Sequence, residues 1–175
     1  MLCACGLKFA GLGKGMVLTM KIEWKKLMIC ILIPLAVGGL SAVLTKNGMR
    51  EFMSVNKPAF TPPMWLFPVV WTILYIVMGI TSYLVLVSGE EQQKVEGALR
   101  LYGVHLVVNF FWSIIFFNMQ MYLFAFFWLL LLWAFVLLVG LAFYRIRKIA
   151  GASWILYLIW VTFAGYLNWM VYVLN

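Results

Sequence analysis

The chain has 175 residues, enough for one domain, of which 66% are hydrophobic and only 10% are charged. A soluble domain of this length needs far more polar surface, so the composition excludes an ordinary water-soluble protein and indicates an exterior covered by lipid. The net charge is +8, but the basic residues fall between apolar runs and form no basic helix, which favours membrane orientation and anionic headgroups over nucleic acid as their reason.

The first 26 residues differ from the rest because they combine glycines with lysines. No apolar segment among them ends at a small-residue cleavage site, so no signal peptide is predicted. A more typical start, MKIEWKK, begins at Met20, and residues 1–19 are interpreted as an upstream extension of the true start. We expect residues 1–26 to be an extension that is poorly ordered or lies at the membrane interface, and residues 27–175 to form one transmembrane domain.

Five apolar runs follow, each free of charge and each close to the ~20 residues that cross the hydrocarbon core of a bilayer. They are Leu27–Leu44, Trp65–Val87, Leu101–Asn118, Tyr122–Tyr144 and Ala152–Leu174. Backbone polar groups inside lipid must be satisfied within their own segment, so each run is expected to be a helix. The predicted fold class is therefore an all-α membrane protein, a bundle of five transmembrane helices.

The connections between the runs are short except the first, from Thr45 to Met64, which holds three prolines and cannot be one regular helix. Their charges predict an orientation. If the N-terminus is cytoplasmic, the inside segments carry most of the basic residues: Lys21, Lys25, Lys26, Lys94, Arg100, Arg145, Arg147 and Lys148, besides Lys8 and Lys14 of the extension. The outside segments then carry only Lys46, Arg50 and Lys57, so the N-terminus is predicted to be inside and the long first connection outside.

Acid–base chemistry is missing from the apolar runs. The chain has no aspartate, and its glutamates all lie outside the runs, so a proton-coupled transporter has no carboxylate at mid-membrane and a hydrolase triad has no acid. The only histidine, His105, is far from Cys3 and Cys5, and no metal site is predicted. We expect no obligatory cofactor and no conventional enzyme.

Aromatic and amide side chains remain. In the third run His105, Asn109, Trp112 and Phe116 are spaced to share one helical face. Polar residues in a span face protein or a cavity, so this face either joins helices by hydrogen bonds or binds a ligand, and the spacing alone allows both.

In the fifth run, Trp160, Ala164, Leu167 and Asn168 lie on one side. The small Ala164 leaves space beside the indole of Trp160, although packing of helices through Ala164 and Gly165 explains the pattern equally. Together the two faces suggest an apolar, aromatic pocket with a few orienting amides, suited to a flat, conjugated, sparingly soluble molecule.

Three segments carry a resemblance to a known family. They are KPAFTPPMWLFPVVWTILYIVMGI from Lys57 to Ile80, HLVVNFFWSIIFF from His105 to Phe117, and YLIWVTFAGYLN from Tyr157 to Asn168. In this order, on five spans, they resemble the tryptophan-rich sensory protein / translocator protein family (TspO/MBR, the peripheral-type benzodiazepine receptor). The resemblance covers about residues 29–174.

The resemblance implies a homodimer in membrane lipid that binds porphyrins such as protoporphyrin IX, and other hydrophobic aromatic molecules, in a pocket under the first loop. Carried over by motif, the ligand-binding residues are Phe52, Phe60, Asn109, Trp112, Trp160, Ala164 and Leu167.

The chain departs from the family in that loop. Phe60 stands where the family usually has tryptophan, and Glu51–Phe52 stand where it often has Trp-Tyr. In bacterial relatives the pocket tryptophans are associated with light-dependent porphyrin breakdown, so Phe60 argues against that activity here.

The sequence therefore predicts a protein of the bacterial cell membrane that binds porphyrins for sensing, sequestration or transport. The alternatives are a light-dependent porphyrin-degrading enzyme and a regulatory protein whose partner reads its ligand state.

Overall fold

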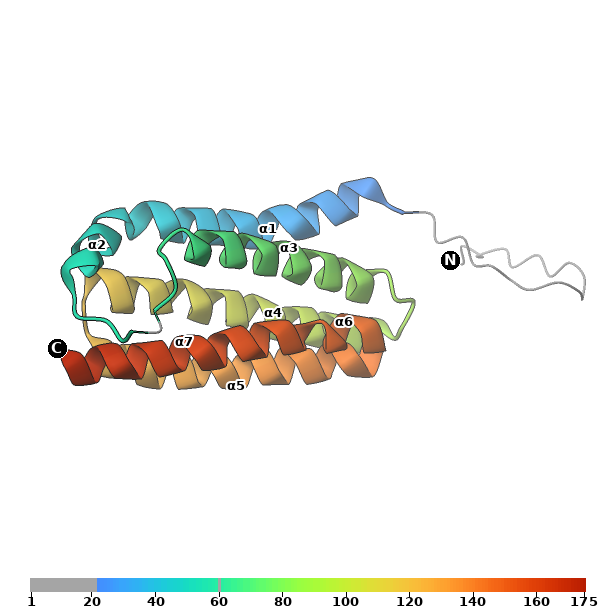
Figure 1. Cartoon of the computed structure of the whole chain (residues 1–175). Coiled ribbons are helices and arrows are strands. Elements are labelled where there is room, and N and C mark those ends of the chain that lie inside the picture. Colours follow the sequence, from blue (N-terminus) through green and yellow to red (C-terminus); the bar gives the residue numbers. More distant parts are fainter. Residues whose placement is uncertain (1–21, 60) are drawn as a thin grey trace, which may run out of the picture.

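The computed structural model describes residues 22–59 and 61–175, which form a bundle of long helices lying side by side (Figure 1). Within these residues five helical segments are long and apolar enough to cross a membrane: Trp24–Leu44, Leu66–Leu86, Gln92–Asn118, Tyr122–Ile146 and Lys148–Leu174. The predicted fold class is confirmed, since each segment contains most of one predicted apolar run. The prediction of an extension concerns residues 1–21, which lie outside the described residues, and Ile22–Lys26, of which the last three already belong to the first helix.

The described residues form the following elements. They are α1 (Trp24–Leu44), α2 (Lys46–Glu51), the 3-10 turn η1 (Phe52–Ser54), α3 (Leu66–Leu86), α4 (Gln92–Ser113), the π-helical turn η2 (Ile114–Asn118), α5 (Tyr122–Ile146), α6 (Lys148–Ala152) and α7 (Trp154–Leu174). Helix α1 packs on α3 and on α4, α4 packs on α5, and α5 packs on α7. Side chains of α3 and α7 complete the ring of helices, because Trp71 meets Tyr157 and Phe67 meets Trp160.

The third span begins much earlier than predicted, at Gln92 rather than Leu101. Hydropathy marks only the part of a helix that lies in hydrocarbon, whereas the polar residues before Leu101 are good helix formers. They are held in register by pairs one turn apart: Gln92 Nε2 donates to Glu96 Oε1 at 2.7 Å, and Arg100 Nη2 donates to Glu96 Oε2 at 3.3 Å. Lys94 and Arg100, assigned to a loop by the sequence, therefore lie on α4.

A glycine allows α1 and α3 to pack closely. A Cβ atom on Gly79 would lie 2.5 Å from the Cα atom of Ile31 and 2.8 Å from the carbonyl oxygen of Cys30. Because both neighbours are backbone atoms, no side-chain rotation relieves that contact. Close backbone approach at small residues is a common way of packing transmembrane helices, where no hydrophobic force drives them together.

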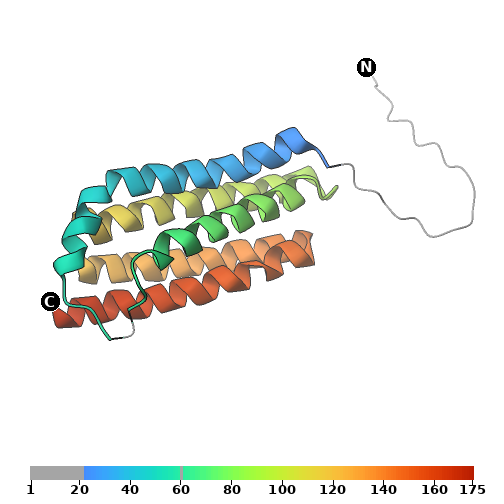
Figure 2. The ribbon, with the colours of Figure 1, turned by 45° about the horizontal axis from the view of Figure 1, so that its top comes forward.

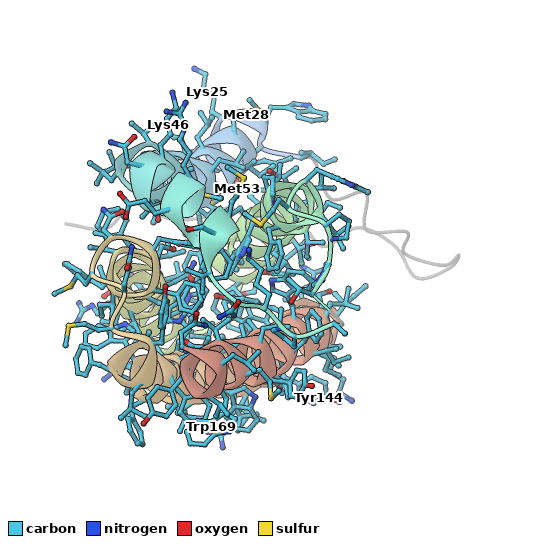
Figure 3. The ribbon with its side chains drawn as sticks, turned by 60° about the vertical axis from the view of Figure 1, so that its left-hand side comes forward. Lys25, Met28, Lys46, Met53, Tyr144 and Trp169 are labelled. Carbon is cyan, nitrogen blue, oxygen red and sulfur yellow. The ribbon has the colours of Figure 1, made fainter. Side chains whose placement is uncertain are left out.

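One long irregular segment crosses an end of the bundle, and we call it the strap: residues 52–59 and 61–64, with residue 60 outside the description. It follows α2, passes the C-terminal end of α7 and turns back to the start of α3 (Figure 2). In the view from that end (Figure 3), Met53 lies on the strap in front of the helices, whereas Trp169 points outward from α7. The segment is not one regular helix, as its prolines predict.

Candidate functional site

A cavity lies inside the bundle beneath the strap. It encloses about 950 Å³ of space not filled by protein atoms, part of which is open to the surroundings. Helices α1, α3, α4 and α7 and the turn η2 form its walls, while α2 and the strap close it above. Its aromatic lining residues are Phe52, Phe67, Trp71, Tyr75, Trp112, Phe116 and Phe117.

The α4 wall is built around Trp112. This side chain is buried, and its ring stacks on Phe116 with centroids 5.3 Å apart and planes 23° apart. The ring of Trp71 lies 6.4 Å away on α3. The indole Nε1 of Trp112 is buried without a hydrogen-bond acceptor among the described residues, an unfavourable state for an N–H group. An acceptor on a bound molecule would relieve it.

Asn109 has a different place from Trp112, although the two were predicted on one face. Asn109 is only 1% exposed and does not line the cavity. Its Nδ2 donates to the hydroxyl oxygen of Tyr75 at 3.1 Å, and Tyr75 does line the cavity. Asn109 therefore holds a wall residue in position from behind. The sequence allowed two interpretations of this face, hydrogen bonds between helices or a ligand pocket. The structure places Asn109 in a hydrogen bond between helices and Trp112 in the cavity wall.

Helix α7 supplies Ala164, Leu167 and Asn168 to the cavity wall. The Nδ2 of Asn168 donates to the carbonyl oxygen of Tyr122 at 2.7 Å, which attaches the wall to α5. Trp160, which the sequence also predicted for the site, is half-buried and does not line the cavity. Its ring lies 5.9 Å from Phe67, a lining residue, so it supports the wall in the way that Asn109 does.

Helix α2 and the strap together form the roof of the cavity. The roof contains Phe52, which η1 directs into the bundle. Phe52 is buried, and its ring centroid lies 5.2 Å from that of Phe116 and 5.5 Å from that of Phe117. The Nζ of Lys57 lies 5.0 Å from the centre of the Phe52 ring, a cation–π distance, and donates to the carbonyl oxygen of Met53 at 2.8 Å. Phe60, the other predicted roof residue, lies outside the described residues.

The sequence predictions named no ligand-binding residue on α3 or α1, which form two further walls of the cavity. On α3 the lining residues Phe67, Trp71 and Tyr75 are one helical turn apart, which is the spacing that drew attention to the third span. On α1 small residues line the cavity: Gly38, Ser41, Ala42 and Thr45. The aromatic residues of α3 recur every four positions, and this pattern could have predicted a cavity-lining face. The small residues of α1 could not, because the same pattern is typical of ordinary helix packing.

Comparison with known proteins decides the family. The sequence pattern of the TspO/MBR family matches residues 30–174, which include parts of all five spans. The chain belongs to the TspO/MBR family. It is 41% identical over 150 residues to the tryptophan-rich protein TspO of Chlorobaculum tepidum, a match that covers 85% of this chain and 95% of the relative.

Other relatives of this TspO/MBR protein come from distant organisms. Protein CrtK of Rhodobacter capsulatus is 37% identical, with 70% of this chain and 76% of the relative covered. The human translocator protein is 33% identical, with 72% and 75% covered. The family and the five membrane-spanning helices together make the chain an integral membrane protein.

Proposed function

We propose that this TspO/MBR protein binds porphyrins of the protoporphyrin IX type, and related flat hydrophobic molecules, in the cavity beneath the strap. The observation that carries the proposal is the cavity itself, whose walls are mostly aromatic and small apolar residues. Flat conjugated rings stack well on such walls, and few polar groups there need to be desolvated. Binding serves sensing, sequestration or transport of the ligand.

The printed names of the relatives support a binding function over a catalytic one. They are called tryptophan-rich sensory protein and translocator protein, names that describe sensing and movement rather than a reaction. We therefore propose a protein that is not an enzyme and that needs no obligatory cofactor, with the porphyrin as its ligand. The resemblance to the family further implies a homodimer surrounded by lipid, which is part of the proposal.

We also propose that the protein lies in a bacterial cell membrane with its strap outside. The start of α1, the start of α4 and the turn between α5 and α6 all lie at the end of the bundle away from the strap (Figure 1). Basic side chains collect at this end, among them Lys25, Arg100, Arg145 and Lys148. An excess of Lys and Arg favours the cytoplasmic side of a membrane. The cavity would then receive ligand from the outer face.

Titration of the purified protein with protoporphyrin IX tests the function, with tryptophan fluorescence as the readout. Saturable quenching is expected, because Trp71 and Trp112 lie in the cavity wall. Ala164→Phe should abolish it by filling the cavity, whereas Leu156→Phe, at a position of α7 that is 62% exposed on the outside of the bundle, should leave it unchanged. Equal binding by both variants would place the ligand elsewhere, and no saturable binding by the unaltered protein would reject the function.

A further inference from the structure

The strap is attached to the end of α7 by a single side-chain amide. Asn175, which follows α7, accepts a hydrogen bond at its Oδ1 from the backbone N–H of Asn56 at 3.2 Å. Its Nδ2 donates to the backbone oxygen of Asn56 at 3.0 Å and to the carbonyl oxygen of Val171 at 2.9 Å. One amide group thus pairs with both backbone groups of a strap residue that lies 119 positions away in the chain.

We infer that Asn175 is a positioning residue for the ligand site: its amide holds the strap over the cavity and so controls how fast a ligand enters and leaves. The inference rests on the proposed function in so far as it concerns a ligand. It concerns a different property, however. The cavity decides whether a ligand binds, whereas the hydrogen bonds between Asn175 and Asn56, which we call the clasp, decide how readily the roof opens.

The two halves of the roof are attached very differently. The first half, α2 with η1, is packed firmly: Phe52 is buried among phenylalanines, and a Cβ on Gly48 would lie 2.3 Å from the backbone oxygen of Phe117. A hydrogen bond reinforces this half, since Gln120 Nε2 donates to Glu51 Oε2 at 2.8 Å. At the end of α1, just before α2, Asn118 Nδ2 donates to the oxygen of Leu44 at 3.0 Å.

The second half, residues 55–59 and 61–64, has much weaker attachments. Within the described part of the chain, it makes two hydrogen bonds with Asn175 and one where it joins α3, from the backbone N–H of Leu66 to the oxygen of Pro63 at 2.9 Å. Its other bonds are local, such as those from Thr61 to the oxygen of Pro58. Yet Thr61 and Met64 of this half line the cavity, so this half must move if the roof is to open.

The clasp is also placed where it can break without damage to the core. Asn56 and Asn175 are both exposed, so water can replace each bond when the strap lifts. The first half of the roof would remain seated on η2 as the second half opens. In Figure 1 the strap passes directly beside the C-terminus, which agrees with the position of the clasp.

The chain offers an unusually well matched set of variants. Asn175→Ala removes every bond of the clasp. Asn56→Pro removes the backbone N–H that the clasp uses and leaves Asn175 intact. Asn56→Ala is the control, because the clasp contacts the backbone of Asn56 and not its side chain.

The first measurement is backbone hydrogen exchange of the strap without any ligand. Asn175→Ala and Asn56→Pro should speed exchange at residues 55–59 and 61 roughly three- to tenfold, the factor expected from net bonds of this kind. Exchange in α2 should not change, and neither should exchange of the strap in the control Asn56→Ala. The second is stopped-flow binding of protoporphyrin IX. Its association and dissociation rates should rise together by a similar factor, with Kd nearly unchanged.

Unaltered strap exchange in Asn175→Ala would overturn the inference, and so would equal effects of Asn175→Ala and Asn56→Ala. A lower unfolding temperature with unaltered exchange and rates would likewise overturn it, by showing a purely structural role for Asn175. If the unaltered protein binds no porphyrin, the proposed function fails, whereas the exchange experiment still decides whether the clasp closes the strap.

Discussion

The two ends of the bundle use the same kinds of side chain and reach opposite results. Away from the strap, Tyr102, His105, Trp154 and Tyr157 fill the space between α4, α5 and α7, and none is more than 6% exposed. His105 Nε2 lies 3.1 Å from the hydroxyl oxygen of Tyr157, and Trp154 Nε1 donates to Thr81 Oγ1 at 3.1 Å. Beneath the strap, Trp71, Trp112 and their neighbours instead surround empty space.

The difference comes from the residues that face the aromatic rings. At the packed end rings face rings, as where His105 lies 5.2 Å from Trp154 and 5.4 Å from Tyr157. At the cavity end the rings face small residues of other helices, such as Gly38, Ala42 and Ala164. Aromatic content alone therefore does not make a binding site in this bundle. A site forms where rings on two helices meet small side chains on the others.

The largest predicted effect falls on the packed end. Trp154→Ala should lower the free energy of unfolding by about 3–5 kcal/mol, because it empties a space between four rings and leaves Thr81 without its donor. Denaturant titration in detergent micelles measures this loss. Trp65→Ala is the control, since Trp65 is 65% exposed. A similar loss in both variants would mean that the packed end has no special role in stability.

The next effect separates binding from stability. Trp112→Leu should weaken protoporphyrin IX binding roughly tenfold or more, the usual cost of losing a central aromatic contact, with a smaller change in stability than in Trp154→Ala. The reason is that Trp112 lines the cavity, whereas Trp154 does not. Fluorescence titration and denaturation of both variants test the contrast. The comparison between the two ends would fail if Trp154→Ala, still folded, lost as much affinity as Trp112→Leu.

The smallest effect tests the role of small residues. A Cβ atom on Gly38 would lie 2.1 Å from the Tyr75 ring, whereas one on Gly39 would meet nothing within 4 Å. Gly38→Ala should therefore displace Tyr75, strain its bond with Asn109, and weaken porphyrin binding several-fold, roughly the effect of one lost hydrogen bond. Gly39→Ala should bind normally. Equal affinities of the two variants would show that space at Gly38 does not shape the cavity.

The sequence by itself determined the five spans and the fold class, because hydropathy is a local property of about 20 consecutive residues. It also identified the faces that carry Trp112, Ala164 and Leu167, since helical spacing decides which residues of one helix lie together. The family resemblance added the roof, where Phe52 lies over the cavity.

Only the tertiary structure decided which of these side chains reach the cavity. Asn109 lies behind Tyr75 and Trp160 behind Phe67, because the rotation of each helix and the size of its neighbours set what is exposed inside a bundle. Spacing along one helix contains no information about either. The same holds for the clasp between Asn56 and Asn175, whose partners lie on segments 119 positions apart and meet only because α7 ends beside the strap.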